Sequence, residues 1–323
     1  MRPMKLTPGK VQFVTVNEDD EGQRIDNFLM RVIPGVPRPL VYRVLRKGEV
    51  RVNKGRVKQS YRLATGDVVR VPPVKFEPVD DKPLPPRSVV DELEQSIIYE
   101  GDGWLAINKP SGIAVHGGSG VRIGVIEAMR VLRPKFRYLE LVHRLDRDTS
   151  GCLLMATKGS ALRAAHEALR SRAASKDYLA LVAGRWPRRK NRIEAPLLKT
   201  HRQSGERVVR VDEQGGKPAL TQFQLLSASD DFSLVRARPV TGRTHQIRVH
   251  AQIAGHPIAG DEKYSTKDIN TRAGGLGLRR LFLHAERLSI KALALNIYAP
   301  ADSKLVDVVH RARLDASALE ARR

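Results

Sequence analysis

The apolar positions near the start of the chain follow a helical spacing. They recur every three or four residues, as on one face of a helix, first at Ile25, Phe28, Leu29 and Val32 and then at Val41, Val44 and Leu45. The segment EVRVNKGRV, residues 49–57, has apolar residues alternating on both sides of an Asn-Lys-Gly turn, which predicts a hairpin. VVRVP, residues 68–72, predicts a further strand. These elements predict a small α+β domain over residues 22–72.

A proline-rich stretch separates this block from the rest of the chain. Six prolines lie between residues 72 and 86. Proline lacks the backbone N–H that a central strand or a continuing helix needs. We therefore expect an extended linker over residues 73–90, and an N-terminal extension over residues 1–21 ahead of the small domain.

The remaining chain alternates strand-like and helix-like patterns without a regular period. Its strand-like segments are SIIYEGDGWLAINKP, CLLMAT, KDYLALVAG, FSLVRARPVTG and RLFLHAERLSI. Ser160 and Thr244 are each expected to cap a helix. We predict an α+β fold with a mixed, largely antiparallel sheet over residues 91–300, followed by a C-terminal tail over residues 301–323.

Composition adds a strong positive charge to this picture. Lys and Arg number 57 against 35 Asp and Glu, a net charge of +22. Such a charge favours a polyanionic partner, with nucleic acid the first expectation and an anionic membrane surface the second. No apolar run approaches the ~18 residues that a membrane span requires. The single cysteine, Cys152, excludes an internal disulfide and indicates a reduced, cytoplasmic location.

The positive charge is concentrated in the small domain. Residues 22–72 hold 12 Lys or Arg against three acidic residues. A solvated face is the ordinary explanation of a charge run. Because the excess here is one-sided, we expect binding to RNA phosphates. The basic residues that cluster around the second helix and the following strand are Arg38, Arg43, Arg46, Lys47 and Arg51.

Several catalytic motifs are missing. The sequence has no GxxxxGK[ST] phosphate loop, no GxSxG nucleophile elbow and no HExxH zinc motif. One cysteine cannot build a thiolate zinc site. We therefore expect neither a metal nor a cofactor.

Asp146 is an acidic residue with basic neighbours in the sequence. In HRLDRDTSG, residues 143–151, Asp146 lies between Arg144 and Arg147. The segment alone fits a surface ion pair beside a turn, and it also fits an ionised carboxylate held for chemistry on a polyanion. Taken singly, Tyr178 would be a core residue and Arg243 a surface charge.

Together these segments resemble two known families. QRIDNFL, KGEVRVNKGRV and GDVVRV resemble the ribosomal-protein-S4-like RNA-binding module. HRLDRDTSG resembles the signature around the catalytic aspartate of the RluA-type pseudouridine synthases. The other matching segments stand in the same order as in that family. NKPSGIAVHGG precedes HRLDRDTSG, and the segments after it are KDYLALV, GRTHQIRVH, AGHPIAGDEKY and RLFLHAERL.

The resemblance implies a role for each matching residue. Asp146 corresponds to the catalytic aspartate, Tyr178 to a tyrosine that packs on the target base, and Arg243 to an arginine that pairs with the aspartate. Leu283 aligns with a pocket leucine. The implied role of the two arginines that flank the aspartate is contact with RNA phosphate or neighbouring loops.

The implied activity is the isomerisation of specific uridines in 23S rRNA, with the target base flipped out of its helix. The implied partner is 23S rRNA or a large-subunit assembly intermediate, bound by a monomer. Two alternatives stay open: a non-catalytic RNA-binding or ribosome-assembly protein on the same fold, and a non-specific basic DNA-binding protein.

Overall fold

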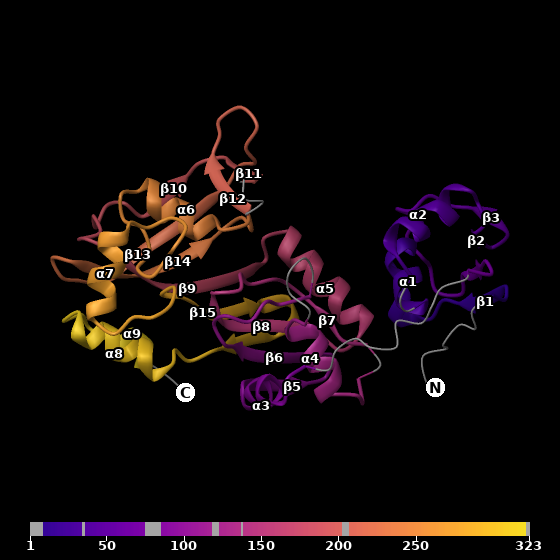
Figure 1. Cartoon of the computed structure of the whole chain (residues 1–323), viewed down its shortest axis with the longest axis horizontal. Helices are drawn as coiled ribbons and strands as arrows, with labels where there is room; N and C mark the ends of the chain where they lie inside the picture. The colour runs from indigo at the N-terminus through magenta and orange to yellow at the C-terminus, as the bar shows by residue number, and fades with distance from the viewer. Residues whose placement is uncertain are drawn as a thin grey trace.

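The computed structural model describes residues 9–33, 36–74, 85–117, 123–136, 138–201 and 207–320. Figure 1 shows a small domain that carries α1, α2 and strands β1–β4 beside a larger domain built on one long sheet. Most of the expected linker, residues 75–84, lies outside the described residues. No helix in the described part of the chain is long and apolar enough to cross a membrane.

The small domain is a four-stranded sheet with two helices on one face. Its antiparallel order is β1-β4-β2-β3, and apolar residues of α1 and α2 share a core with the inward side chains of the sheet. The predicted helices, hairpin and strand are present. β1 falls in the expected N-terminal extension, and its pairing with β4 moves the start of the domain ahead of residue 22. The elements are β1 (Gln12–Thr15), η1 (Glu18–Asp20), α1 (Ile25–Val32), α2 (Arg38–Arg46), β2 (Arg51–Val52), β3 (Gly55–Arg56) and β4 (Val68–Val71).

The large domain is built on a mixed sheet of order β10-β13-β14-β9-β15-β8-β6-β5. Within the described residues its neighbours pair antiparallel, except that β15 and β8 run parallel. The predicted α+β class with a largely antiparallel sheet is confirmed. β11 and β12 form a separate two-stranded sheet. The strands of the large domain are β5 (Ile97–Gly101), β6 (Trp104–Lys109), β7 (Glu140–Leu141), β8 (Ser150–Ala156), β9 (Ala174–Ala183), β10 (Arg192–Glu194), β11 (Leu197–His201), β12 (Arg207–Val211), β13 (Leu220–Ala228), β14 (Phe232–Pro239), β15 (Leu283–Ile290) and β16 (Leu295–Tyr298).

Helices cover both faces of this sheet, because its central strands are apolar on both sides. In β9, Tyr178 and Ala180 face a core shared with α3, α4 and α6, whereas Leu179 and Leu181 face a core shared with α7 and α8. α5 packs over the β8 end. The helices are α3 (Arg87–Gln95), α4 (Val125–Leu132), α5 (Gly159–Arg170), α6 (Gln246–Ile253), α7 (Lys267–Gly275), η2 (Lys291–Leu293), α8 (Ser303–Arg311) and α9 (Ser317–Glu320).

Three details differ from the sequence-based expectations. α5 and α6 follow Lys158 and His245, neither of which makes a side-chain cap, so the caps expected at Ser160 and Thr244 are wrong. α3 begins inside the segment expected as linker. The expected C-terminal tail forms α8 and α9, and Leu305 of α8 is buried against the sheet, so this segment is part of the large domain.

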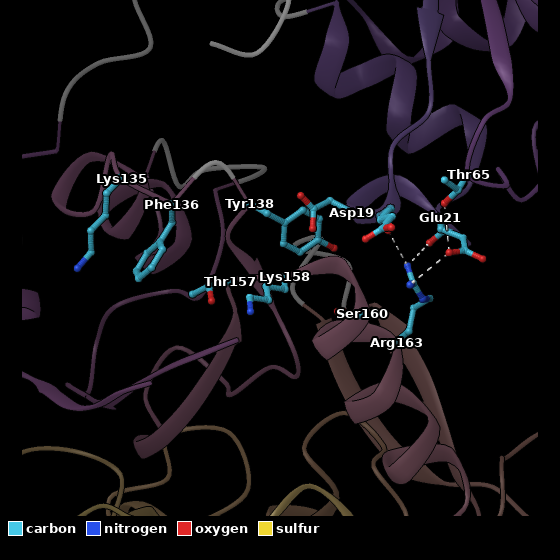
Figure 2. A pocket seen from close by; sticks show the side chains of 11 residues that line it. Asp19, Glu21, Thr65, Lys135, Phe136, Tyr138, Thr157, Lys158, Ser160 and Arg163 are labelled. Atoms are coloured by element: carbon cyan, nitrogen blue, oxygen red, sulfur yellow. Dashed lines mark hydrogen bonds and ion pairs between the residues drawn. The ribbon is translucent and has the colours of Figure 1, made fainter. Parts of the chain in front are cut away.

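The two domains meet where α5 begins. Arg163 donates to the backbone oxygens of Glu18 (3.3 Å) and Glu21 (2.7 Å), and the N–H of Gly159 donates to Asp19 (3.4 Å). Figure 2 shows Asp19 and Glu21 of the small domain beside the start of α5, where they line a cavity of about 730 Å³. Carboxylates at a helix N-terminus are favoured by the helix dipole, so α5 provides a docking point for the small domain.

Candidate active site

Three neighbouring strands gather segments that are far apart in the sequence. β15 lies between β8 and β9, so the loop that precedes β8, the middle of β9 and the first residue of β15 come together. Asp146, Tyr178 and Leu283 line one small cavity of about 70 Å³ there. α6 closes the cavity with His245, Ile247 and Arg248.

Asp146 is the carboxylate of this cavity. Its side chain is 30% exposed, so the carboxylate can be reached from solution. One oxygen lies 3.5 Å from Nη1 of Arg248 and 3.8 Å from Nε2 of His245. The backbone oxygen of Asp146 accepts the N–H of Thr149 (3.2 Å), which holds the turn that leads into β8. Arg248 thus places a positive charge beside the carboxylate of Asp146.

Arg248 is fixed in place by a second carboxylate. Nε and Nη2 donate to the two oxygens of Asp261, each at 2.7 Å, and its guanidinium lies 5.0 Å from the ring centroid of Tyr264. Burial opposes the charge of Arg248, but Asp261 and Asp146 outweigh it and raise the pKa of Arg248 above its ordinary value. The bidentate pair leaves Nη1 free to point at Asp146, so one guanidinium is shared by two carboxylates.

The expected pairing of Asp146 with Arg243 is therefore wrong. Arg243 is exposed, and its Nε donates to the backbone oxygen of Pro218 (3.2 Å) instead of reaching the cavity. Its backbone N–H donates to Gln246 (3.0 Å), which places Arg243 ahead of α6. Arg248 lies within α6 and turns inward, so the same segment GRTHQIRVH supplies the arginine five residues later.

Tyr178 and Leu283 form the apolar wall of the cavity. Tyr178 is only 8% exposed and Leu283 only 3%. Burial first, and then the negative charge of Asp146, raise the pKa of the Tyr178 hydroxyl. Tyr178 therefore stays neutral and offers an aromatic face beside the carboxylate, as expected for a group that packs on a base.

His245 adds a contact that no motif-based argument had identified. Its backbone is left-handed at φ 53°, and its Nδ1 lies 2.7 Å from the Tyr264 hydroxyl. That hydroxyl oxygen accepts the N–H of Val209 (2.9 Å), so its proton is directed to Nδ1. The imidazole proton is then on Nε2, facing Asp146. Burial lowers the pKa of His245, against the opposing charge of Asp146, which favours this neutral form.

Lys109 supports the Asp146 loop from below. This fully buried lysine donates to the backbone oxygens of Pro110 (2.7 Å), Ile113 (2.9 Å) and Arg147 (2.9 Å). Burial lowers the pKa of Lys109 to about 7. The segment NKPSGIAVH, which alone could be only a turn, thus ties the loop that carries Asp146 to β6. The sequence signal was a lysine directly before Pro-Ser-Gly.

The predicted basic residues fall in three places. Arg144 and Arg147 are exposed beside Asp146, where Arg144 lines the cavity and Arg147 pairs with Asp148 (3.0 Å). Arg51 lies on the sheet of the small domain. The others are exposed on or just after α2, namely Arg38, Arg43, Arg46 and Lys47. No group of side chains suited to a metal ion occurs in the described ranges.

Each of the two domains matches a known family model, and relatives of similar length match both domains at once. Residues 103–252 match the model of the RNA pseudouridylate synthases, and residues 23–69 match the S4 domain. The chain is 53% identical over 310 residues to ribosomal large subunit pseudouridine synthase C of Haemophilus ducreyi, covering 94% of this chain and 97% of that protein. The chain belongs to the RNA pseudouridylate synthase family.

Further relatives of this pseudouridine synthase agree. The Escherichia coli (strain K12) protein, ribosomal large subunit pseudouridine synthase C, is 50% identical over 317 residues, covering 96% of this chain and 99% of that one. A solved structure, human RNA pseudouridylate synthase domain containing 4, is 28% identical with a TM-score of 0.60, covering 71% of this chain and 97% of that chain. The resemblance to pseudouridine synthases and to the S4-like module is thus confirmed.

Proposed function

We propose that this pseudouridine synthase isomerises specific uridines of 23S rRNA, with Asp146 as its catalytic carboxylate. The observation that supports this most directly is the shared cavity of Asp146, Tyr178, Leu283 and Arg248. The relatives named above are ribosomal large subunit enzymes, which supports the choice of RNA.

The chemistry of the cavity fits the reaction. Pseudouridine forms when the bond between ribose carbon 1′ and uracil nitrogen 1 breaks, the uracil turns, and its carbon 5 bonds to the ribose; carbon 5 then loses its proton and nitrogen 1 gains one. Asp146 acts as the nucleophile or the base, and the guanidinium of Arg248 lies 3.5 Å from its carboxylate. The neutral ring of Tyr178 packs on the uracil, and stacking of this kind contributes about 1–3 kcal/mol.

The target uridine has to leave its helix to reach Asp146. Base flipping costs a few kcal/mol, so the enzyme must hold both the flipped base and the flanking RNA. Arg144 and Arg147, exposed on either side of Asp146, would bind phosphates next to the flipped nucleotide. Arg38, Arg43, Arg46, Lys47 and Arg51 would hold a more distant part of the RNA.

Removing the charge of Asp146 tests the assignment. We expect Asp146→Asn to lower pseudouridine formation in purified precursor rRNA by at least about 10²-fold, the lower end for a positioned acid–base group. Asp148→Asn is the matched control, because Asp148 lies two residues away and faces Arg147 rather than the cavity. Pseudouridine formed at the wild-type level by Asp146→Asn would refute the assignment of Asp146 as the catalytic carboxylate.

We further propose that the enzyme works in the cytoplasm as a monomer without a cofactor, on free 23S rRNA or on an assembly intermediate. The reaction moves no electrons to or from another molecule and transfers no group, so side chains suffice. All the groups placed around the cavity come from one chain. The single cysteine is buried, which fits a reducing compartment.

A further inference from the structure

The outer face of the small-domain sheet carries an unusual row of side chains. Cross-strand partners point to the same face of a sheet, and the register joins Phe13 to Arg70, Arg70 to Arg51, and Arg51 to Arg56. One aromatic residue and three arginines therefore cross all four strands in line. We call these four residues the outer row.

The outer row lies opposite the core of the domain. Val14, Val52 and Val69, the neighbours of the row along the strands, belong to the apolar core beneath α1 and α2. Phe13 is 61% exposed, the largest exposure among the big apolar residues of the described chain. Figure 1 shows the helices on the side of the small domain nearer the large domain and the strands on the far side.

The row does nothing evident for the stability of the domain. Like charges on directly opposed strand positions repel, and an exposed phenylalanine gains nothing from burial. Within the described residues, none of the three guanidinium groups pairs with a carboxylate. Arg70 donates to the backbone oxygen of Glu49 (2.6 Å), and Arg51 makes only long contacts with backbone oxygens, at 3.4 Å. The charges are thus left available for an anion.

A groove of about 1000 Å³ runs along the outer row, and its other charged lining residues are Lys47, Lys54 and one acidic residue, Glu49. Its apolar part is Phe13 together with Val68, which is 39% exposed. An aromatic face with several cations around it matches a nucleotide, whose base stacks while its neighbouring phosphates are neutralised. A base within a duplex is already stacked on both sides and cannot offer a face to Phe13.

We propose that the outer row binds unpaired RNA, with one base stacked on Phe13 and the flanking phosphates held by Arg51, Arg56 and Arg70. This surface is separate from the arginines of α2, because α2 covers the opposite face of the sheet. The inference rests on the proposed function only in taking RNA as the polyanion. It adds a site for a single-stranded segment outside the active site.

Binding of the full-length protein to two RNA probes tests the site. One probe is a blunt duplex, and the other is the same duplex with a single-stranded adenosine extension. Binding of the extended probe does not depend on isomerisation, because the adenosines of the extension are not substrates for pseudouridine formation. We expect Phe13→Ala to weaken binding of the extended probe by about 5- to 150-fold, the factor that corresponds to loss of one stacked base, with little change for the blunt duplex.

Matched variants separate stacking from folding and from general attraction. Phe13→Trp keeps an aromatic face and should retain binding, whereas Phe13→Leu keeps apolar bulk without that face and should lose it. Arg51→Gln, Arg56→Gln and Arg70→Gln should each reduce the salt dependence of binding to the extension by about 0.7 in log–log slope, the single-strand value for one phosphate contact. Arg87→Gln on α3, at a side chain 94% exposed, is the charge-matched control.

Three results would overturn the inference. The first is unchanged binding of the extended probe by Phe13→Ala and Phe13→Leu, and the second is an equal loss of binding for both probes. The third is a difference in sedimentation between the RNA-free wild type and the RNA-free Phe13 variants, which would make the outer row a contact between two copies of the protein. The proposed function fails on a separate result, in which Asp146→Asn still forms pseudouridine while the Phe13 variants lose binding of the extended probe.

Discussion

At the scale of single residues, the active site depends on how one guanidinium is held. Arg248 makes a bidentate contact with Asp261 and still presents Nη1 to Asp146 at 3.5 Å. A lysine would keep the charge but has no planar fork, so it cannot serve both carboxylates in this geometry. The contribution of Arg248 is therefore its shape as much as its charge.

Exchanging the two arginines of the motif for lysine tests this reasoning. We expect Arg248→Lys to lower the turnover number on an rRNA fragment by about 10²-fold, the effect of misplacing a reacting group by about 1 Å. Arg243→Lys is the same chemical change at an exposed position and should retain most of the turnover number. Lysine is preferable to alanine here, because alanine would leave the buried carboxylate of Asp261 without its cation and destabilise the site. Equal loss in both variants would contradict the assignment of Arg248.

At the scale of elements, the parallel pair of β8 and β15 fixes the Asp146 loop. His284 of β15 lies opposite Ser150, the first residue of β8, and its Nδ1 lies 2.9 Å from the Ser150 hydroxyl. Nε2 donates to the backbone oxygen of Ala299 (2.8 Å), so Nδ1 accepts the serine proton. Gly151 allows the close approach, because a Cβ there would lie 2.2 Å from the backbone oxygen of Ala285.

This buried contact should make the large domain sensitive to acid. Burial lowers the pKa of His284 to about 4, against an ordinary value of 6.5. Between these values the unfolded chain binds a proton that the folded chain does not, so the free energy of unfolding falls as the pH drops from 6.5 towards 4. The shift corresponds to about 3 kcal/mol for this residue.

Urea unfolding at several pH values, followed by tryptophan fluorescence, measures the effect. Both tryptophans, Trp104 and Trp186, lie in the large domain, so the signal reports that domain. Burial also lowers the pKa of His143, His166, His245 and His250, which contribute their own acid sensitivity. His284→Gln removes one of these groups, so the difference between the variant and the wild type should change by about 3 kcal/mol over this range. Parallel curves would mean that His284 does not titrate as described.

The elements also show how far the sequence could be used. Helical spacing was sufficient for α1 and α2, whose apolar residues all face one core. The motif matches predicted that Asp146, Tyr178 and Leu283 belong to one site, and the three residues line one cavity. A motif match identifies each residue by its place in the sequence and does not require the position where a helix begins. Arg243 and Arg248 share one short segment, and the choice between them depends on the left-handed His245 that sets the start of α6. Periodicity carries no information about such a turn.

Two terminal segments were assigned wrongly for a different reason. β1 has only four residues, and its pairing with β4 joins positions more than fifty residues apart, which no local pattern shows. In α8, Leu305, Val308 and Val309 do have helical spacing and lie buried against the sheet. That pattern is present in the sequence and predicts the helix, but helical spacing alone does not show that the helix packs against the sheet of the large domain.

At the scale of the whole molecule, the proposed RNA-binding surfaces are divided between two domains that meet at the start of α5. The active site lies in the large domain, and the basic surfaces of α2 and the outer row lie in the small one. The distance between these surfaces depends on how the domains dock. Arg163 supplies much of that contact, through the backbone of Glu18 and Glu21 and the side chain of Glu21 at 3.6 Å.

Removing Arg163 should loosen the docking without unfolding either domain. Arg163 and Glu21 are 39% and 48% exposed, so their attraction is screened by salt and contributes little to global stability. We expect Arg163→Ala to broaden the distribution of distances between spin labels placed at Lys58 in the small domain and Arg87 in the large one. The native Cys152 is buried and would not take a label, so two introduced cysteines suffice.

The control is Arg170→Ala on the same helix, because Arg170 pairs with Glu167 of α5 and touches no residue of the small domain in the described contacts. It should leave the distribution as narrow as in the wild type. Raising the salt to about 1 M shortens the Debye length to about 3 Å and screens the pair with the Glu21 carboxylate, while the hydrogen bonds to the backbone remain, so the wild type should move only part of the way towards the Arg163→Ala result. If Arg163→Ala and the wild type stay alike at every salt concentration, the docking rests on other contacts, and the spacing of the two RNA-binding surfaces is not set by this ion pair.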